Sequence, residues 1–431
     1  MNQPTIPEHQ LLSALQADAF KYFVNEVNLE NGLVVDCTKE GWPSSIAAVG
    51  LALSVYPIGV ERGWISRDEA IERTLRKLRF FSASVQSTSP DATGYKGFYY
   101  HFLDMKSGKR AWKCELSTVD TTFLIAGMLA AAAFFNQDSE DEKEIRTLAD
   151  KLYLRVDWQW AMNRGATLTH GWRPETGFLP HRWTGYDEST LAYVLGIGSP
   201  TLPLPAESFQ SRNWQSEWKK VYGYEYLYEG SLFAHQFSHI WIDFREIQDE
   251  FMRDHDSDYF ENSRRATYAQ REYARQNPQG FQGYSEVCWG LTACEGPGPM
   301  DLIINGTKRV FFDYVARGIP DGPDDGTLAP WSVVASLPFA PEIVLPTLKH
   351  FNEIEVGVER PYGLEATFNP TFPDQEGRKC GWVSPWHFGI NQGPIVLMIE
   401  NYRNEFIWQL MRSCPYIVSG LHRAGFRGGW L

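Results

Sequence analysis

Apolar residues along this chain recur mostly at the spacing of a helix. One face of the segment 9–27 carries Leu12, Leu15, Ala19 and Phe23. The run Ser66-Arg67-Asp68-Glu69 has the form of a capping box, which predicts that a helix starts there. Further helices are expected at 118–135, 140–156, 233–252, 258–276, 341–352, 392–400 and 405–411. Few runs alternate as strands do, so the pattern predicts an all-α protein.

These helices are of two kinds. Segments 66–81 and 140–156 are charged and amphipathic, whereas 43–60 and 121–135 are small and apolar throughout. Apolar helices belong inside a fold and amphipathic ones outside. Six rounds of such alternation would close an (α/α)6 toroid, although a helical solenoid would give a similar pattern without a fixed repeat. No segment has the composition of a linker, so we expect one domain over residues 1–431.

Long connections rich in Gly, Trp and His separate the apolar helices. They include 171–188, 284–299 and 362–391, and the loosest stretch is 296–330, which we expect to be a loop. Long ordered loops on a rigid scaffold commonly carry binding residues. The sequence therefore predicts a substrate cleft built from these loops.

The composition narrows the choice of partner. The chain has 40 basic and 53 acidic residues, a net charge of −13, and no basic block. This excludes nucleic acid and anionic membranes as expected partners. Aromatic residues make up 14% of the chain, with 16 Trp, and flat rings with a polar edge are suited to sugars. A carbohydrate partner is therefore favoured, and the sequence predicts no oligomeric state.

The chain lacks the signatures of export, cofactor binding and disulfide bonding. No apolar run is long enough to span a membrane, and residues 1–10 do not resemble a signal peptide. We expect a cytoplasmic protein, or a periplasmic one if a signal has been removed. The six cysteines form no CxxC pair and are expected to be reduced, mostly buried thiols. Because GxSxG, P-loop and dinucleotide motifs are absent from the sequence, no cofactor is expected.

Three segments place carboxyl groups in aromatic or apolar surroundings. Glu188 follows Trp172, Arg182, Trp183 and Tyr186, Glu286 lies between Tyr284 and Trp289, and Glu115 and Asp120 lie at the start of an apolar helix. Each has a structural explanation, since acids stabilise the first turn of a helix and buried acids are commonly hydrogen-bonded. The functional explanation is that an apolar pocket raises a carboxyl pKa, so that the group can donate a proton at neutral pH.

A fourth segment could bind a metal or hydroxyl groups. His235, His239 and Asp243 are four residues apart and would share one face of a helix, as zinc ligands can. No HExxH motif accompanies them, so we expect no metal and favour hydroxyl binding or a hydrogen-bonded polar core.

Two carboxyl groups flanking a bond are the minimum machinery for glycoside cleavage. In this context several motifs resemble one family. They are Gly-Phe-Tyr-Tyr-His-Phe at 97–102, Trp-Gly-Leu-Thr-Ala at 289–293, and the runs 41–50, 58–64, 171–188, 196–201, 235–245, 261–273 and 391–403. The run 171–188 ends in Gly-Tyr-Asp-Glu. The family is the "glucoamylase-like" superfamily, which includes endo-β-1,2-glucanases of glycoside hydrolase family 144 and the transglycosylation domain of cyclic β-1,2-glucan synthases. The resemblance implies an (α/α)6 fold and β-1,2-glucan as the substrate class.

The resemblance also implies catalytic roles. Glu188 matches the glutamate that looks like the general acid, and Asp120 falls where the endoglucanases carry Glu, but Ser117 replaces one of their Asp residues. Glu115 and Glu286 look more like the synthase domain, which is similar to a retaining enzyme. This favours Glu286 as a nucleophile with retention, while a water activated from the Asp120 or Glu115 side, with inversion, is the alternative.

We therefore expect a glycoside hydrolase or transglycosylase acting on β-1,2-glucan. The alternatives are a non-catalytic glucan-binding toroid and a glycosidase for another linkage. The residues expected to bind substrate are Trp172, Arg182, Trp183, Tyr186, His235, His239, Asp243, Tyr284, Trp289 and Trp386.

Overall fold

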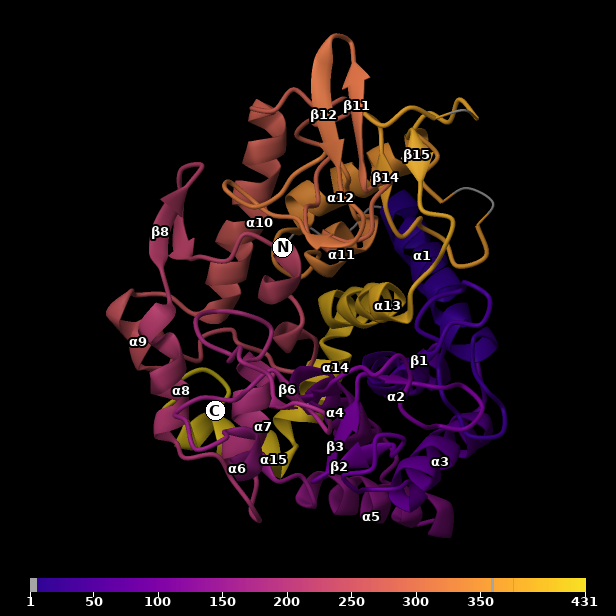
Figure 1. The fold of residues 1–431 in the computed structure, drawn as a ribbon, viewed down its shortest axis with the longest axis vertical. Coiled ribbons are helices and arrows are strands. Elements are labelled where there is room, and N and C mark those ends of the chain that lie inside the picture. Colours follow the sequence, from indigo (N-terminus) through magenta and orange to yellow (C-terminus); the bar gives the residue numbers. More distant parts are fainter. Residues whose placement is uncertain (1–5, 358–359, 375) are drawn as a thin grey trace.

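Two concentric rings of helices make up the body of the protein (Figure 1). This computed structural model describes residues 6–357, 360–374 and 376–431. The six inner positions are held by α2 (Ile46–Glu61), α4 (Thr118–Phe134), α7 (Thr190–Gly198), the 3₁₀ turns η2 (Leu232–His235) and η3 (Ser238–Ile240), α11 (Pro330–Ala335) and α13 (Gly389–Asn404). Their outer partners are, in the same order, α3 (Arg67–Ala83), α5 (Glu140–Leu154), α15 (Pro415–Arg423), α10 (Tyr259–Gln276), α12 (Pro341–Glu353) and α1 (Ile6–Asn25). The predicted (α/α)6 toroid is confirmed.

The inner ring closes where α13 packs against α2, so the last inner helix meets the first. The first and last helices, α1 and α15, lie in the outer ring, because α1 packs on α13 and α15 packs on α7. Short helices occupy the connections between the rings. They are α6 (Trp158–Ala161), α8 (Glu207–Arg212), η1 (Asn213–Gln215), α9 (Glu250–Asp254) and α14 (Phe406–Arg412).

Burial follows the two kinds of helix that the sequence predicts. Helices α2 and α4 are buried along nearly their whole length, whereas α3 and α5 bury one face only. A Cβ added at Gly127 would lie 1.9 Å from the carbonyl oxygen of Gly50. The two inner helices can therefore approach this closely only because both positions are glycine.

Side-chain caps fix the starts of several helices. Ser66 Oγ accepts a hydrogen bond from the Glu69 backbone N–H at 3.1 Å, which confirms the helix start predicted there. Ser117 caps α4 in the same way, accepting from the Asp120 N–H at 3.2 Å. This second cap fixes the first turn of α4, from which Ser117, Val119 and Asp120 line the candidate site.

Among the described residues, six small antiparallel sheets lie on the helical body. The largest has the order β2 (Gly94–Tyr95), β3 (Phe98–Tyr100), β5 (Leu116–Ser117), β6 (Gly171–Arg173) and β7 (Gly177–Phe178). The two-stranded sheets pair β1 (Ser44–Ser45) with β4 (Phe102–Leu103), β8 (Trp218–Val221) with β9 (Tyr224–Leu227), β10 (Ala293–Cys294) with β13 (Val315–Ala316), β11 (Met300–Ile304) with β12 (Thr307–Phe311), and β14 (Phe368–Asn369) with β15 (Trp382–Val383).

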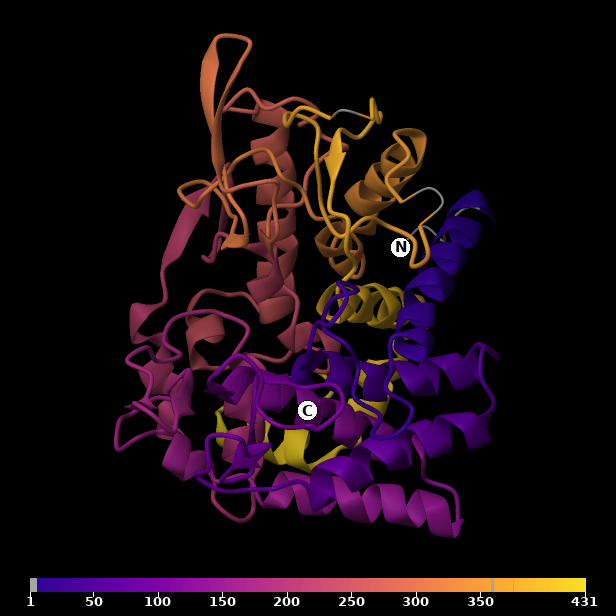
Figure 2. The ribbon, with the colours of Figure 1, turned by 45° about the vertical axis from the view of Figure 1, so that its right-hand side comes forward.

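The stretch 296–330 was expected to be a loop, and this prediction is wrong in part. Strands β11 and β12 form a hairpin that projects from the body of the protein (Figures 1 and 2). Its turn is Asn305-Gly306, and both residues have positive φ, 50° and 78°. A two-residue turn with two positive φ angles matches the twist of a hairpin, which explains why the strands pair here.

The helix predicted at 233–252 is also wrong. The segment breaks into η2, η3 and an irregular stretch before α9. Gln236 Nε2 donates to Ser332 O at 2.6 Å, and Ser238 Oγ donates to Glu188 O at 3.0 Å. These buried polar side chains bond to neighbouring segments, and such local competition favours short 3₁₀ turns over a continuous helix.

All six cysteines are buried and unpaired, as predicted. Within the described residues, no helix has the length and apolar character needed to cross a membrane.

Candidate active site

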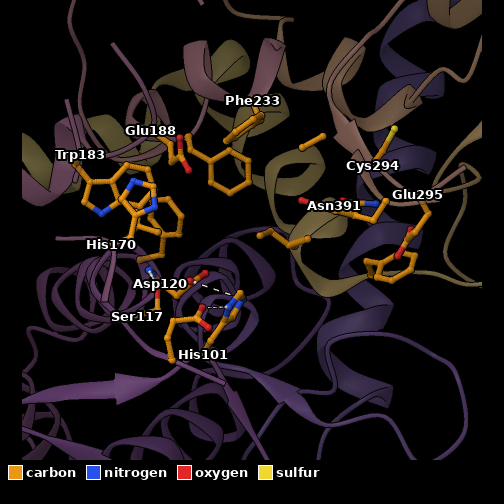
Figure 3. Close-up of a pocket in the computed structure, with 18 of the residues that line it drawn as sticks. His101, Ser117, Asp120, His170, Trp183, Glu188, Phe233, Cys294, Glu295 and Asn391 are labelled. Carbon is orange, nitrogen blue, oxygen red and sulfur yellow. Dashed lines mark hydrogen bonds and ion pairs between the residues drawn. The ribbon is translucent and has the colours of Figure 1, made fainter. Parts of the chain in front are cut away.

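A cavity of about 330 Å³ opens at the end of the toroid where α4, α7 and α13 begin (Figure 3). Its walls come from the first turns of α4 and α13, the loop before α7, and the short β-ladders above them. The lining residues are His101, Glu115, Ser117, Val119, Asp120, Phe123, His170, Leu179, Trp183, Glu188, Phe233, Phe237, Ala293, Cys294, Glu295, Tyr314, Trp331, Phe388, Ile390 and Asn391. Three of the four predicted catalytic acids, Glu115, Asp120 and Glu188, are thus brought together.

One wall of the cavity holds two carboxylates on either side of an imidazole. His101 Nδ1 lies 2.9 Å from Glu115 Oε1, and His101 Nε2 lies 3.6 Å from Asp120 Oδ2. Ser117 Oγ donates to Asp120 Oδ2 at 2.5 Å, and Arg173 Nη2 lies 3.6 Å from Glu115 Oε2. Ser117 therefore both caps α4 and orients the Asp120 carboxylate.

The charges on this wall stabilise one another. Burial opposes a charge on His101, but Asp120 and Glu115, with a contribution from Asp36, outweigh it and raise the pKa of His101 to about 9. Burial likewise opposes ionisation of Glu115, but His101 and Arg173 lower the pKa of that carboxyl to about 2. At neutral pH this wall therefore presents an imidazolium and an ionised Glu115.

Glu188 projects into the cavity from the loop before α7, apart from His101 and Asp120 (Figure 3). Burial, followed by the negative charges of Asp187, Glu229 and Asp120, raises its pKa well above the usual range of a carboxyl. Burial and these charges therefore favour the protonated form of Glu188, which is the form that can donate a proton. The cavity combines this acid with an ionised one, which is the division of roles that glycoside cleavage requires.

A flat aromatic surface lies beside Glu188. The indole of Trp183 stacks on the His170 imidazole with ring centroids 3.8 Å apart, and its Nε1 donates to Thr118 Oγ1 at 2.9 Å. Burial lowers the pKa of His170, so that this ring is neutral at pH 7. The predicted sugar-binding residue Trp183 is thus held rigidly at the cavity wall.

Glu295, Tyr314 and His101 line the cavity although the sequence analysis assigned them no role. Burial, followed by the charges of Asp36 and Asp313, raises the pKa of Glu295 to about 8. Asp36 accepts a hydrogen bond from Trp42 Nε1 at 3.1 Å, and burial raises its own pKa to about 6. The sequence could have pointed to His101, because this residue lies in the family-like motif Gly-Phe-Tyr-Tyr-His-Phe at 97–102.

The structure removes Glu286 from the candidate catalytic set. Its side chain is exposed on the surface, and its charge acts on Arg275 in the last turn of α10. The neighbouring residues Tyr284 and Trp289 are also not in the cavity. Tyr284 Oη donates to Asp324 Oδ1 at 2.8 Å, and the buried Trp289 donates from Nε1 to Thr347 Oγ1 at 2.9 Å. A backbone turn between Ser285 and Cys288 leaves Glu286 facing solvent.

Three other predicted binding residues, Trp172, Arg182 and Tyr186, support the site loop from outside the cavity. Trp172 packs against Tyr95, Arg182 Nη1 donates to Thr167 O at 2.6 Å, and Tyr186 stacks on Tyr259. The fourth, Trp386, is 36% exposed and precedes Phe388, which does line the cavity.

The predicted face of His235, His239 and Asp243 does not form, because the helix that would align them is absent. His235 Nε2 contacts Glu229 O at 3.0 Å, and His239 Nε2 contacts Ser263 Oγ at 3.0 Å. Asp243 instead forms an ion pair with Arg245 at 2.7 Å. These side chains are a hydrogen-bonded polar core, which was one of the alternatives expected from the sequence.

Several known proteins are similar to this chain over nearly its whole length. An exo beta-1,2-glucooligosaccharide sophorohydrolase (non-reducing end) of Parabacteroides distasonis is 27% identical over 96% of this chain. The chain spans 58% of the length of that curated relative. An endo-beta-1,2-glucanase of Chitinophaga pinensis, solved with sophorotriose and glucose, is 25% identical with a TM-score of 0.86, covering 99% of this chain and all of that one. A beta-1,2-glucanase structure from Parabacteroides distasonis is 26% identical with a TM-score of 0.85, covering 99% of this chain and 61% of that one.

A family comparison is decisive for membership. The Glycoamylase family model, described as "Putative glucoamylase", matches residues 180–415, more than half of the chain. The matched segment begins just before Trp183 and contains α13, so it includes the cavity-lining residues Glu188, Glu295 and Asn391. The chain belongs to the Glycoamylase family.

Proposed function

We propose that this protein is a glycoside hydrolase that cleaves β-1,2-linked glucan. The observation that carries the proposal is that one cavity holds both Glu188, whose carboxyl pKa burial raises, and an ionised Glu115 beside Asp120 and His101. Supporting it are the relatives, whose names specify β-1,2-glucan or its oligosaccharides. The acids lining the cavity also disfavour an anionic substrate and suit a neutral sugar.

In the proposed reaction, Glu188 protonates the glycosidic oxygen of the leaving sugar. Asp120 or Glu115 acts as the general base: it takes a proton from a water molecule, whose oxygen then attacks the anomeric carbon. Glu286 lies outside the cavity, so it cannot serve there as the nucleophile of a retaining mechanism. The proposal is therefore inversion, with the α-anomer released first from the β-glucan. The charge of His101 keeps the neighbouring Glu115 carboxyl group ionised, while burial favours the protonated form of Glu188.

The test is a pair of matched substitutions. Glu188→Gln keeps the shape of the side chain but cannot donate a proton as an acid, so turnover of linear β-1,2-glucan should fall by roughly 10²-fold or more while binding persists. Glu286→Gln is the same change at an exposed position outside the cavity, and it should leave turnover within about twofold of the unmodified protein. Near-normal turnover by Glu188→Gln would remove this residue from the mechanism.

The stereochemical part has a separate readout. Proton NMR of the first-formed reducing end should show the α-anomer, which mutarotates to the mixture afterwards. Initial appearance of the β-anomer would overturn the proposed inversion.

A further inference from the structure

A second polar wall of the cavity, apart from Glu188, takes no part in the proposed reaction. Glu295 projects from this wall (Figure 3), and Tyr314 lines the same cavity. The two residues come from the ladder in which Cys294 of β10 pairs with Val315 of β13. Since Glu295 follows one member of this pair and Tyr314 precedes the other, their positions in the antiparallel ladder are adjacent.

A single buried guanidinium fixes this ladder. Arg317 forms two hydrogen bonds with Asp325, at 2.8 and 2.7 Å, and a third from Nη1 to Cys294 O at 2.5 Å. Its Nη2 also donates to Phe312 O at 3.2 Å, so both segments of the ladder are bound to one side chain. A Cβ at Gly296 would lie 2.2 Å from Arg317 Nη2, which explains the glycine next to Glu295. Glu295 is thus held in a preformed position.

The functional groups on this wall are available to a ligand. Among the described residues, Glu295 forms no ion pair, in contrast to Glu115, which contacts both His101 and Arg173. The Tyr314 side chain is 68% exposed although it borders the cavity. A carboxyl without an ion pair, next to an exposed ring, can bind the hydroxyl groups and the apolar face of a sugar.

We propose that Glu295 is a specificity-determining residue, which hydrogen-bonds a hydroxyl of the glucose unit next to the scissile bond while Tyr314 covers that unit. This inference rests on the proposed glucan-cleaving function and gives a substrate-binding role to the wall that takes no part in the reaction. Glu295 binds the substrate and is not a catalytic residue, because Glu188 donates the proton.

The protonation state defines what Glu295 offers to the sugar. With burial and Asp36 raising its pKa to about 8, the group is neutral at pH 7 and donates a hydrogen bond through its O–H. The ionisable groups whose charges act with that of Glu295 are Asp36 and Cys37 from the loop before β1, and Cys294, Asp313, Tyr314 and Arg317 from the ladder. Above pH 8 the carboxylate can only accept, so a sugar oxygen placed as an acceptor loses its partner.

A binding experiment in the Glu188→Gln background tests the assignment without interference from turnover. Calorimetry with a β-1,2-linked gluco-oligosaccharide at pH 6, 7.5 and 9.5 would compare this variant with the double variants that add Glu295→Gln or Glu295→Ala. Adding Glu295→Ala should weaken binding roughly tenfold at pH 6, since it removes the donor. Adding Glu295→Gln keeps a neutral donor, so this variant should still bind at pH 6. Because Gln does not ionise, the affinity of this variant should fall less between pH 6 and pH 9.5 than that of the Glu188→Gln protein. Any effect of His101 titration stays in all three proteins and cancels in the comparison.

Kinetics of the single variants provide the second readout. Glu295→Ala should raise KM at pH 6 by roughly tenfold with a smaller change in kcat, and Glu286→Gln serves as the control. Equal affinity with and without Glu295→Ala at pH 6 would overturn the assignment, as would a Glu295→Gln variant that binds normally but has lost turnover. Failure of the unmodified protein to cleave β-1,2-glucan would instead refute the proposed function, and this assignment with it.

Discussion

Replacing His101 with Gln tests whether a charged imidazole stabilises the acidic wall. The pKa of His101 rises from 6.5 to about 9 on folding, mainly through Asp120 and Glu115 acting against burial. At about 1.4 kcal/mol per pKa unit, this shift corresponds to roughly 3 kcal/mol. The side chain is 29% exposed, so solvent screening reduces the expected contribution to about 2 kcal/mol.

The sign of the pH dependence follows from the direction of this shift. Because the pKa is raised in the folded state, the stabilisation is fully present below pH 6.5 and is lost as the pH rises through 9. His101→Gln should therefore destabilise the protein most at pH 6 and progressively less by pH 10. Any loss of packing caused by the substitution would be the same at both pH values.

Thermal unfolding at both pH values measures the effect. With about 2.1 cal/mol/K per residue, the unfolding entropy of 431 residues is about 0.9 kcal/mol/K, so about 2 kcal/mol lowers Tm by about 2 °C. His181→Gln is the matched control, because His181 is exposed and lies in the connection 171–188, outside the acidic wall. It should shift Tm by less than about 0.5 °C. An equal Tm deficit for His101→Gln at pH 6 and pH 10 would refute the reasoning.

Three further substitutions probe the site and its supports. Trp183→Phe reduces the stacking surface and should raise KM for β-1,2-glucan about two- to tenfold in initial-rate assays, and an unchanged KM would exclude Trp183 as a sugar platform. Asp325→Asn leaves the buried Arg317 charge without its partner and should cost about 3–5 kcal/mol, a fall in Tm of about 3–5 °C, whereas an unshifted melt would contradict the role of this pair. Gly127→Ala places a methyl group against Gly50 and should reduce the free energy of unfolding in urea by about 3 kcal/mol, a loss that would not appear if α2 and α4 could separate freely.

Much of the helical framework can be predicted from the sequence because burial in a toroid imposes a clear pattern. The apolar run predicted as a helix at 118–135 is α4, Thr118–Phe134, and the amphipathic segment predicted at 258–276 is α10, Tyr259–Gln276. Inner helices are buried on all sides and outer helices on one side, so the local composition is enough to assign each helix to the inner or the outer ring.

The hairpin β11–β12 was missed although a local signal for it exists. Asn305-Gly306 is the residue pair that a two-residue hairpin turn favours, and both residues adopt the positive φ that the turn requires. The Gly- and Pro-rich residues on both sides of this segment are typical of a loop and obscured it.

The sequence favoured Glu286 as a site residue and gave no role to Glu295, whereas in the structure Glu295 lines the cavity and Glu286 does not. Both acids lie in aromatic or apolar surroundings, nine residues apart along the same stretch. Glu295 reaches the cavity because its strand pairs with Val315 and Ala316, about twenty residues later, and because Arg317 fixes that pairing. Such non-local contacts leave no periodicity in the residues next to Glu295, so the orientation of its side chain depends on the tertiary structure.

The most direct measurement of the central claim is the substrate selectivity of the purified protein. Linear β-1,2-glucan and starch would be incubated with the unmodified chain and with Glu188→Gln, and the products followed by chromatography. Our account predicts that the unmodified chain converts β-1,2-glucan to shorter β-1,2-linked products, leaves starch intact, and loses this activity with Glu188→Gln. Hydrolysis of starch with β-1,2-glucan untouched would contradict it.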